Sequence, residues 1–509
     1  MRKEKNRRLQ NIERNIFFPT LILVAASVLI MLFMPEKAGQ VINRAFDVMI
    51  HKVGWLYLAV VPIVFGLTLW IAFSKFGKIK LGEPGDKKQY SDWAWTAMMF
   101  TAGMSAATVV LSFTDPITLM TNPPLGAEPM SLEAYGAAHM YNQFACGPIA
   151  WGLYGPASAA VAYMIFVKKV SVLRISSTCT PVLRDGKRKW IGTLIDILMM
   201  LGMIGGVSTS LGIGTPTVSA FINHLTGIPE STTLTICIMA IWGLMFGTSV
   251  YLGLEKGIKN LSDFNFCLLF ILLVFVMIKS PMDNTLYLEL NSIGLVVDNI
   301  GTLLFGSTPF NQDTFTQNYT VFYWAWWLSF MPMIALFGAR ISKGRTIKQM
   351  LLGEVLYGGG GSMLVFGVCG GYSLYLQQSG TMDLVSIIAD QGSAYAVLSV
   401  IGTLPFPKIF MWLTLALLFI FLATTIDSTA YTLASVCTVR LTGDEQPARW
   451  NRLLWAVLLL LFSLSLVLIG GLQTIQTASI LTGFPMIFIV GIIVAALVQM
   501  KRESKTHGF

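Results

Sequence analysis

Long apolar runs dominate the pattern of hydrophobic and polar positions in this chain, and short polar loops separate them. Each run is long enough to cross about 30 Å of hydrocarbon as a helix. The pattern predicts twelve spans, at 17–34, 53–74, 93–113, 143–167, 192–222, 232–254, 264–280, 320–341, 350–377, 407–439, 452–471 and 476–499. The fifth and tenth runs exceed one straight crossing, so we expect them to tilt or to extend into the aqueous phase.

Composition agrees with a multi-pass membrane protein. Only 12% of the 509 residues are charged, whereas a soluble domain carries about 25% charged residues. Four loops on one predicted side contain no Lys or Arg, at 114–142, 223–231, 281–319 and 378–406, while loops on the other side carry most of the basic residues. This asymmetry predicts two cytoplasmic termini in a bacterial inner membrane. The net charge of +9 is then a topology signal, and no nucleic-acid partner is expected.

Cysteine and histidine positions argue against an enzyme. The six cysteines are scattered without a CxxC pair, so we read them as free, buried thiols with no disulfide framework. The four histidines are too dispersed for a metal site or for nucleophilic chemistry. No metal site and no tightly bound cofactor is expected.

The most informative stretch is 319–346, which reads as a span rich in aromatic residues with a basic end. On a helix, Tyr323, Trp326, Trp327 and Phe330 share one face. Such rings can hold a methylated cation, and each desolvated contact contributes about 2 kcal/mol. The alternative is an aromatic belt or simple packing. Trp324 fits a belt, whereas Trp327 lies roughly 12 Å into the span at 1.5 Å per residue, deeper than a belt requires.

Small and polar residues interrupt two other spans. Residues 101–107 permit either close helix packing or local unwinding that exposes carbonyls to an ion. Span ten carries Thr424, Thr425 and Asp427, which are either an ion site or hydroxyls bonded to their own helix beside an internally paired acid. We expect Asp115 to be a helix-end acid exposed on the outside.

Two stretches outside the spans are amphipathic, at 284–305 and 383–403. The first is predicted to be an interfacial helix. For the second, an interfacial helix and an ordered loop are equally consistent with the pattern.

The run Phe-Tyr-Trp-Ala-Trp-Trp at 322–327, followed by Ala-Arg-Ile-Ser-Lys-Gly-Arg-Thr at 339–346, resembles the signature of the betaine/choline/carnitine transporter family. The resemblance extends over essentially the whole chain and includes 253–258, 427–428 and 470–477. Further similarity to the carnitine/γ-butyrobetaine antiporter branch appears at 122–129, 176–181 and 321–323.

The resemblance implies an all-α fold with a LeuT-type 5+5 inverted repeat, formed by spans 3–7 and 8–12 after two peripheral spans. It also implies alternating access, a quaternary ammonium substrate, a lipid bilayer environment and a homotrimer. The expected segments are a basic N-terminus at 1–16, two spans and a loop at 17–91, a first repeat at 92–280, an external interfacial helix at 281–319, a second repeat at 320–499 and a C-terminal tail at 500–509.

Site residues follow from the same resemblance. Trp326 and Trp327 match the central tryptophans of span eight, and Trp151 and Tyr154 match aromatic positions of span four. The chain departs from the family at two cage positions, where Cys146 replaces a tryptophan and Thr118 aligns with a tyrosine. Phe330 also lacks a hydrogen-bonding group. Loss of two rings, at roughly 1–2 kcal/mol each, predicts weaker binding or a different, less methylated or bulkier zwitterion.

Ion coupling stays open between two designs. Sodium-coupled relatives use backbone oxygens that match Thr101 and Met104, together with hydroxyls that match Thr424 and Thr425. Sodium-independent antiporters use a cationic side chain, matched by Lys259, or a methionine sulfur where this chain has Ile334. The retained hydroxyl pair favours Na⁺-coupled uptake of glycine betaine, carnitine or γ-butyrobetaine over substrate exchange.

Overall fold

The computed structural model describes residues 12–170, 174–183, 189–252, 255–306, 315–440, 446–470 and 472–506. These residues are almost entirely helical and form no β-strand, only two isolated bridges. Eleven of their helices are long and apolar enough to cross a membrane, or twelve when one bent pair is counted as a span. The all-α, multi-pass architecture predicted from the apolar pattern is confirmed.

The first half of the chain contains α2 (Arg14–Phe33), α3 (Pro35–Val48), α4 (Gly54–Phe73), α5 (Asp92–Thr101), α6 (Ala106–Thr121), α7 (Leu132–Cys146), α8 (Pro148–Gly152), α9 (Gly155–Phe166), α10 (Thr180–Leu183), α11 (Lys189–Thr226) and α12 (Thr232–Leu252). The second half contains α13 (Glu255–Lys279), α14 (Met282–Phe305), α15 (Val321–Ile341), α16 (Ile347–Gly353), α17 (Gly359–Gln378), α18 (Leu384–Gln391), α19 (Ser393–Gly402), α20 (Pro407–Val436), α21 (Arg449–Ile469) and α22 (Leu472–Thr506). Short π-helical turns precede α4, α15 and α17, at Met49–Val53, Thr316–Thr320 and Glu354–Gly358.

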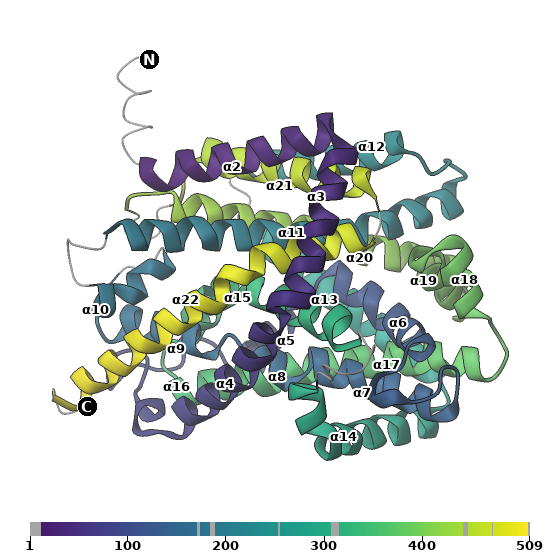
Figure 1. Cartoon of the computed structure of the whole chain (residues 1–509), viewed down its shortest axis with the longest axis horizontal. Helices are drawn as coiled ribbons and strands as arrows, with labels where there is room; N and C mark the ends of the chain where they lie inside the picture. The colour runs from purple at the N-terminus through teal and green to yellow at the C-terminus, as the bar shows by residue number, and fades with distance from the viewer. Residues whose placement is uncertain are drawn as a thin grey trace.

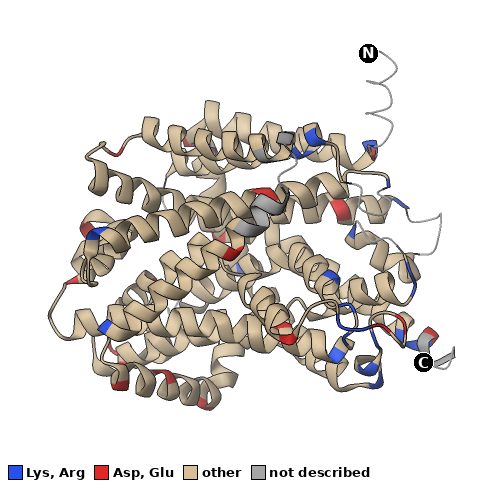
Figure 2. Cartoon of the chain, turned by 180° about the vertical axis from the view of Figure 1, so that it is seen from behind, with Lys and Arg blue, Asp and Glu red and all other residues tan. Residues whose placement is uncertain are grey.

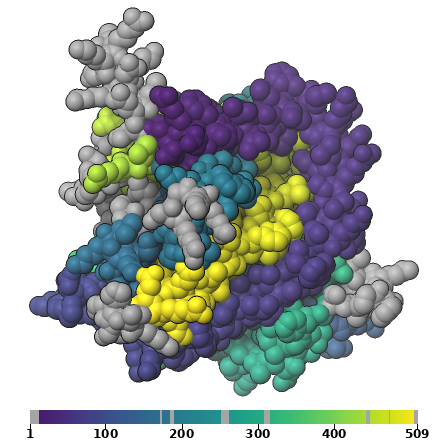
Figure 3. Space-filling model, turned by 60° about the vertical axis from the view of Figure 1, so that its left-hand side comes forward, coloured from purple at the N-terminus to yellow at the C-terminus, as the bar shows by residue number. Residues whose placement is uncertain are grey.

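The helices pack around α11, α15 and α22, which contact one another in the middle of the molecule. Figure 1 shows α2 and α21 along one edge and α14 along the opposite edge. The C-terminal helix α22 crosses the surface diagonally and borders the purple N-terminal helices in Figure 3. At 38 residues, α11 is about 57 Å long. It therefore exceeds a straight crossing, as its sequence predicts.

Two helices differ from the predicted spans in length or in apolar character. The interfacial helix expected at 284–305 is present as α14, which is itself long and apolar enough to cross a membrane. It packs along α7 and α17. The predicted sixth span corresponds to α12, whose described apolar part, Thr232–Thr248, is shorter than the other candidates. The stretch at 383–403 forms the helices α18 and α19, so its helical interpretation is correct.

Charge is distributed unevenly along the molecule. Figure 2 shows most of the Lys and Arg at the end where α2 begins and α22 ends. At that end Arg345, only 3% exposed, pairs with Asp92 at 2.6 Å and lies 4.0 Å above the ring of Trp95. The basic end of the 319–346 stretch therefore ties α15 and α16 to the start of α5. Far from it, hydrogen bonds from Ser386 hold the pKa of the Asp383 carboxyl below its usual range, so this cap of α18 stays ionised.

Two spans are broken. Helices α5 and α6 meet at an angle of 66° around residues 102–105, within the small and polar stretch singled out from sequence. The sequence pattern gave no prediction of the second break, where Gly147 is extended and Pro148 starts α8. Pro148 favours such a start because its missing N–H needs no partner in the first turn.

Candidate functional site

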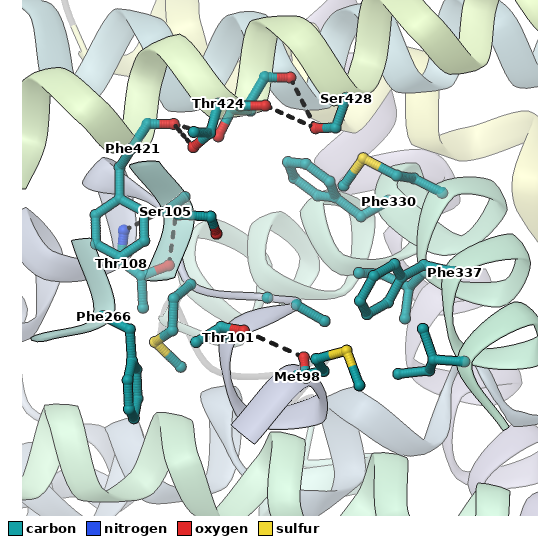
Figure 4. Close-up of a pocket in the computed structure, with 18 of the residues that line it drawn as sticks. Met98, Thr101, Ser105, Thr108, Phe266, Phe330, Phe337, Phe421, Thr424 and Ser428 are labelled. Atoms are coloured by element: carbon teal, nitrogen blue, oxygen red, sulfur yellow. Dashed lines mark hydrogen bonds between the residues drawn. The ribbon is translucent and has the colours of Figure 1, made fainter. Parts of the chain in front are cut away.

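A cavity of about 460 Å³, here the aromatic cavity, lies between the break in span three, α15 and α20. Its walls combine large rings with hydroxyl groups (Figure 4). Its lining includes Thr101, Met104, Ser105, Thr108, Tyr154, Trp326, Trp327, Phe330, Met333, Ile334, Phe337, Thr424, Thr425 and Asp427. It extends to Tyr90 and Ile341, close to the basic end of the molecule.

Four rings form one side of this cavity. The centroids of Trp326 and Trp327 lie 5.8 Å apart, and Phe330 sits 6.2 Å from Trp326 at 73°. Tyr154 from the start of α9 lies 6.4 Å from Trp327. Trp326, Trp327 and Phe330 come from α15, and Tyr154 comes from span four. The rings of two separate elements therefore border the same cavity. This grouping matches the side-by-side placement predicted from helical spacing.

Backbone carbonyls fix the two indoles. Trp326 donates its Nε1–H to the carbonyl of Gly206 at 3.3 Å, and Trp327 donates to the carbonyl of Ala145 at 2.9 Å. A buried polar group without a partner is costly, so both bonds hold the rings in one orientation. The absence of a side chain at Gly206 allows α11 to approach Ser329, since a Cβ there would lie 2.0 Å from the Ser329 hydroxyl oxygen. The indole N–H groups are therefore committed, and only the ring surfaces face the cavity.

Four residues predicted to contact substrate do not line the aromatic cavity, and two of them, Trp151 and Cys146, line neither cavity. Trp151 is fully buried and donates its Nε1–H to Ser362 at 3.0 Å. Its ring packs against Gly103 and lies 6.2 Å from Trp327. Cys146 is buried at the end of α7. Trp151 thus supports the site from behind.

The belt interpretation of Trp324 is wrong. Its side chain is fully buried and meets Phe144 edge-on at 5.3 Å. A belt residue would face the headgroups, whereas this one packs inside the protein. Its indole N–H has no hydrogen-bond partner among the described residues.

The break in span three places polar groups in the cavity. Thr101 ends α5 and Met104 lies in the bend. Ser105 caps α6, accepting a hydrogen bond from the Thr108 N–H at 3.2 Å. The N-terminus of α6, with its partial positive charge, therefore faces the cavity.

Hydroxyl groups of α20 lie on another wall. Thr424 donates to the Ile420 carbonyl at 3.0 Å, and Thr425 donates to the Phe421 carbonyl at 2.8 Å. These bonds use the hydroxyl protons and leave oxygen lone pairs available for a cation. Asp427 is paired with Arg452 at 3.1 Å. The hydroxyls thus bond to their own helix beside a paired acid and also line the cavity, and the ion site stays a prediction.

A second cavity of about 620 Å³, here the distal cavity, lies toward α18 and α19. Tyr323 and Thr118, both predicted near the substrate, line this cavity instead. The Tyr323 hydroxyl donates to the Asp115 carboxylate. The expectation of an exposed helix-end acid is therefore wrong, because Asp115 lies inside α6 and has this long-range partner.

Residues one helical turn apart on α15 line the two different cavities. Phe322 lines the distal cavity, while Trp326, one turn further, lines the aromatic cavity. Their rings stack with centroids 5.8 Å apart and planes at 10°. This stacked pair therefore lies between a residue position of the distal cavity and one of the aromatic cavity.

The remaining ion-coupling candidates are less informative. Ile334 lines the aromatic cavity, and the neighbouring Met333 places its sulfur 3.8 Å from the Thr429 hydroxyl. Lys259 falls within α13, but its side chain lies outside the described residues. The described residues contain no group of three or more His, Cys, Asp or Glu suited to a metal ion. The thiols are free, as expected, but Cys237 and Cys267 are exposed and not buried.

Several lining residues were missed by the sequence analysis, among them Ser105, Thr108, Met333 and Phe337. Ser105 and Thr108 carried a recognisable signal, since Ser followed by a helical run is a capping pattern. Met333 and Phe337 are ordinary apolar residues in an apolar span, and only the approach of α5 and α20 distinguishes them.

A comparison with protein families complements this geometry. The family model described as "BCCT, betaine/carnitine/choline family transporter" matches residues 15–506. The match thus includes both broken spans, both cavities and the whole of α15.

Proposed function

Because this chain belongs to the betaine/carnitine/choline transporter family, we propose that it carries a betaine-like quaternary ammonium zwitterion by Na⁺-coupled alternating access. Membership makes it a multi-pass membrane transporter for solutes of this class and not an enzyme. The choice of zwitterion and the coupling ion are the parts that we propose.

The observation that carries the proposal is the ring wall of the aromatic cavity. Ring faces attract a cation that has methyl groups in place of N–H donors, by about 2 kcal/mol per desolvated contact. Trp326 and Trp327 present such faces because their N–H groups bond elsewhere. No Lys or Arg is among the described residues that line this cavity. Its volume of about 460 Å³ falls in the usual range for small ligands.

A carboxylate at the other end of the substrate has a complementary place. The N-terminus of α6 at Ser105 and Thr108 borders the same cavity. Helix N-termini favour anions because their first N–H groups lack intrahelical partners. A zwitterion would thus place its ammonium on the rings and its carboxylate at this helix end.

Sodium coupling is supported by the position of the two hydroxyls. Thr424 and Thr425 line the cavity together with Thr101 and Met104 of the broken span. Hydroxyl and carbonyl oxygens at an unwound helix are typical Na⁺ ligands in transporters. The alternative of sodium-independent exchange is favoured by one observation, the Met333 sulfur within the cavity lining.

Further parts of the proposal concern architecture. We infer a LeuT-type inverted repeat, in which the broken span three and the aromatic α15 occupy corresponding positions in the two halves. We also propose two cytoplasmic termini, an inner-membrane location and a homotrimer.

Uptake into proteoliposomes tests the proposal. Labelled glycine betaine, carnitine, γ-butyrobetaine and choline would be compared, with Na⁺ or K⁺ outside and with empty or substrate-loaded vesicles. We expect saturable uptake of a zwitterion that an inward Na⁺ gradient accelerates. Uptake that needs internal substrate and ignores Na⁺ would establish exchange instead. No saturable transport of any of the four would reject the substrate class.

A further inference from the structure

A buried acid packs against α15, one of the helices that line the aromatic cavity, and has no role in the proposed function. Glu354 begins the π-helical turn between α16 and α17 and is only 1% exposed. Neither carboxyl oxygen makes a hydrogen bond of normal geometry to a described residue, and the carboxyl interacts only weakly with the nearby Ser158 hydroxyl. A carboxylate in this situation is strongly disfavoured relative to the neutral acid.

The surroundings make room for this carboxyl group. Gly338 of α15 has no side chain, and a Cβ there would lie 2.3 Å from Oε1 of Glu354. Trp95 and Trp151 pack against Gly353 and Gly358, the glycines that flank the π-helical turn. π-Helical turns inside α-helices are frequent at functional sites. The acid is thus inserted between helices of the wall that carries the substrate rings.

Two hydroxyls of one helix face lie near Glu354 or in the cavity wall. Ser158 of α9 lies beside the carboxyl and interacts with it as a side-chain hydrogen-bond partner. Tyr154 lies one helical turn earlier in the chain and lines the cavity. Its hydroxyl interacts electrostatically with Glu354 and makes no hydrogen bond to another described residue. Tyr154 at the cavity and Ser158 at the acid are four residues apart, so they lie on the same side of this part of the chain.

Few other charged groups lie on the helices that surround Glu354. In their described residues, the elements around Glu354 (α5, α8, α9, α15, α16 and α17) carry three groups that are charged at neutral pH, Asp92, Arg340 and Lys348. Asp92 pairs with Arg345, and Lys348 lies over Phe73. No ion pair joins a described residue to Glu354.

We propose that Glu354, which packs against α15 behind the wall of the aromatic cavity, is a proton-binding site and that its proton competes with the cationic group of the substrate. Without substrate, the carboxyl binds a proton, because nothing else neutralises it. A quaternary ammonium on the rings near Tyr154 favours the carboxylate, and the proton leaves to water. By linkage, the proton weakens cation binding as much as the cation weakens proton binding. This inference rests on the proposed substrate class.

The direction of the pH effect follows. Raising the pH removes the proton and leaves an anion near the bound cation. Affinity for choline, a cation without a carboxylate, should therefore rise with pH. The increase is at most about tenfold per pH unit, because one proton is released. In Glu354→Gln the amide cannot ionise, so the same affinity should be independent of pH.

Two measurements on the full-length purified protein test the proposal. Choline binding would be measured from about pH 5.5 to about pH 8.5, a range of about three pH units. The wild type, Glu354→Gln and the control Glu289→Gln would be compared. Glu289 is a partly buried acid of α14 away from both cavities. We expect pH dependence in wild type and in Glu289→Gln, and none in Glu354→Gln. A pH-independent wild type, or a pH-dependent Glu354→Gln, would overturn the competition.

The second measurement needs no ligand. Infrared spectroscopy of the ligand-free protein at neutral pH should show the C=O band of a protonated carboxylic acid that disappears in Glu354→Gln. If the band does not change, Glu354 is not the proton site. If the band is lost as expected but choline and betaine never bind, the proton site stands and the proposed substrate class fails. The two results are therefore distinguishable.

Discussion

Replacing Trp327 by leucine tests whether the indole faces bind the substrate. The side chain is 4% exposed, lines the aromatic cavity and lies between Trp326 and Tyr154. Its loss removes one desolvated cation–π contact of about 2 kcal/mol. At 1.4 kcal/mol per tenfold change, the dissociation constant for glycine betaine should rise about 30-fold.

The same change has a separate effect on stability. Leucine cannot donate to the Ala145 carbonyl, which is bonded by the Trp327 N–H at 2.9 Å. An unpaired buried carbonyl costs about 1–3 kcal/mol of unfolding free energy. Trp327→Phe separates the two effects, because it retains a ring but also loses the N–H. We expect its affinity to fall less than tenfold and its thermal stability to fall as much as that of the leucine variant.

The assay is scintillation-proximity binding of labelled glycine betaine to purified protein, with size-exclusion profiles to check folding. Trp324→Phe is the matched control. This tryptophan is also buried in α15 but lines neither cavity, and its N–H has no described partner. Wild-type affinity in Trp327→Leu, or an equal loss in Trp324→Phe, would mean that the rings only pack.

Three further changes probe other parts of the site. Thr425→Val should abolish the stimulation of uptake by Na⁺. The control Thr414→Val changes a buried α20 hydroxyl outside both cavities and should keep this stimulation; equal Na⁺ dependence in both variants would refute the ion site. Gly206→Ala should lower thermal stability by about 1–3 kcal/mol, because a Cβ would meet Ser329 at 2.0 Å, and unchanged melting would show that α11 can shift. Arg452→Met should destabilise the protein by about 3–5 kcal/mol, since it removes the 3.1 Å ion pair with Asp427. Adding Asp427→Asn should recover part of the loss, and no recovery in the double variant would contradict the pairing argument.

Sequence periodicity predicts the structural features that are set by residues close together in the chain. The apolar runs, the break at 101–107 and the shared face of Trp326 and Trp327 all follow from local patterns. The division of α15 between two cavities does not, because Tyr323 faces Asp115 across more than 200 positions. The buried position of Trp324 likewise depends on Phe144 of another span. Glu354 is an acid inside an apolar run, which the sequence shows. Its burial between α9 and α15 depends on residues far away in the chain and is seen only in the structure.

The stacked pair Phe322 and Trp326 has an electrical consequence. Water-filled cavities conduct ions far better than packed side chains, so the packed protein between the two cavities, which includes this pair, would carry a large share of a membrane voltage. Moving one elementary charge through the full voltage is worth about 2.3 kcal/mol per 100 mV. The rate at which a cation passes from one cavity to the other would therefore depend on membrane potential.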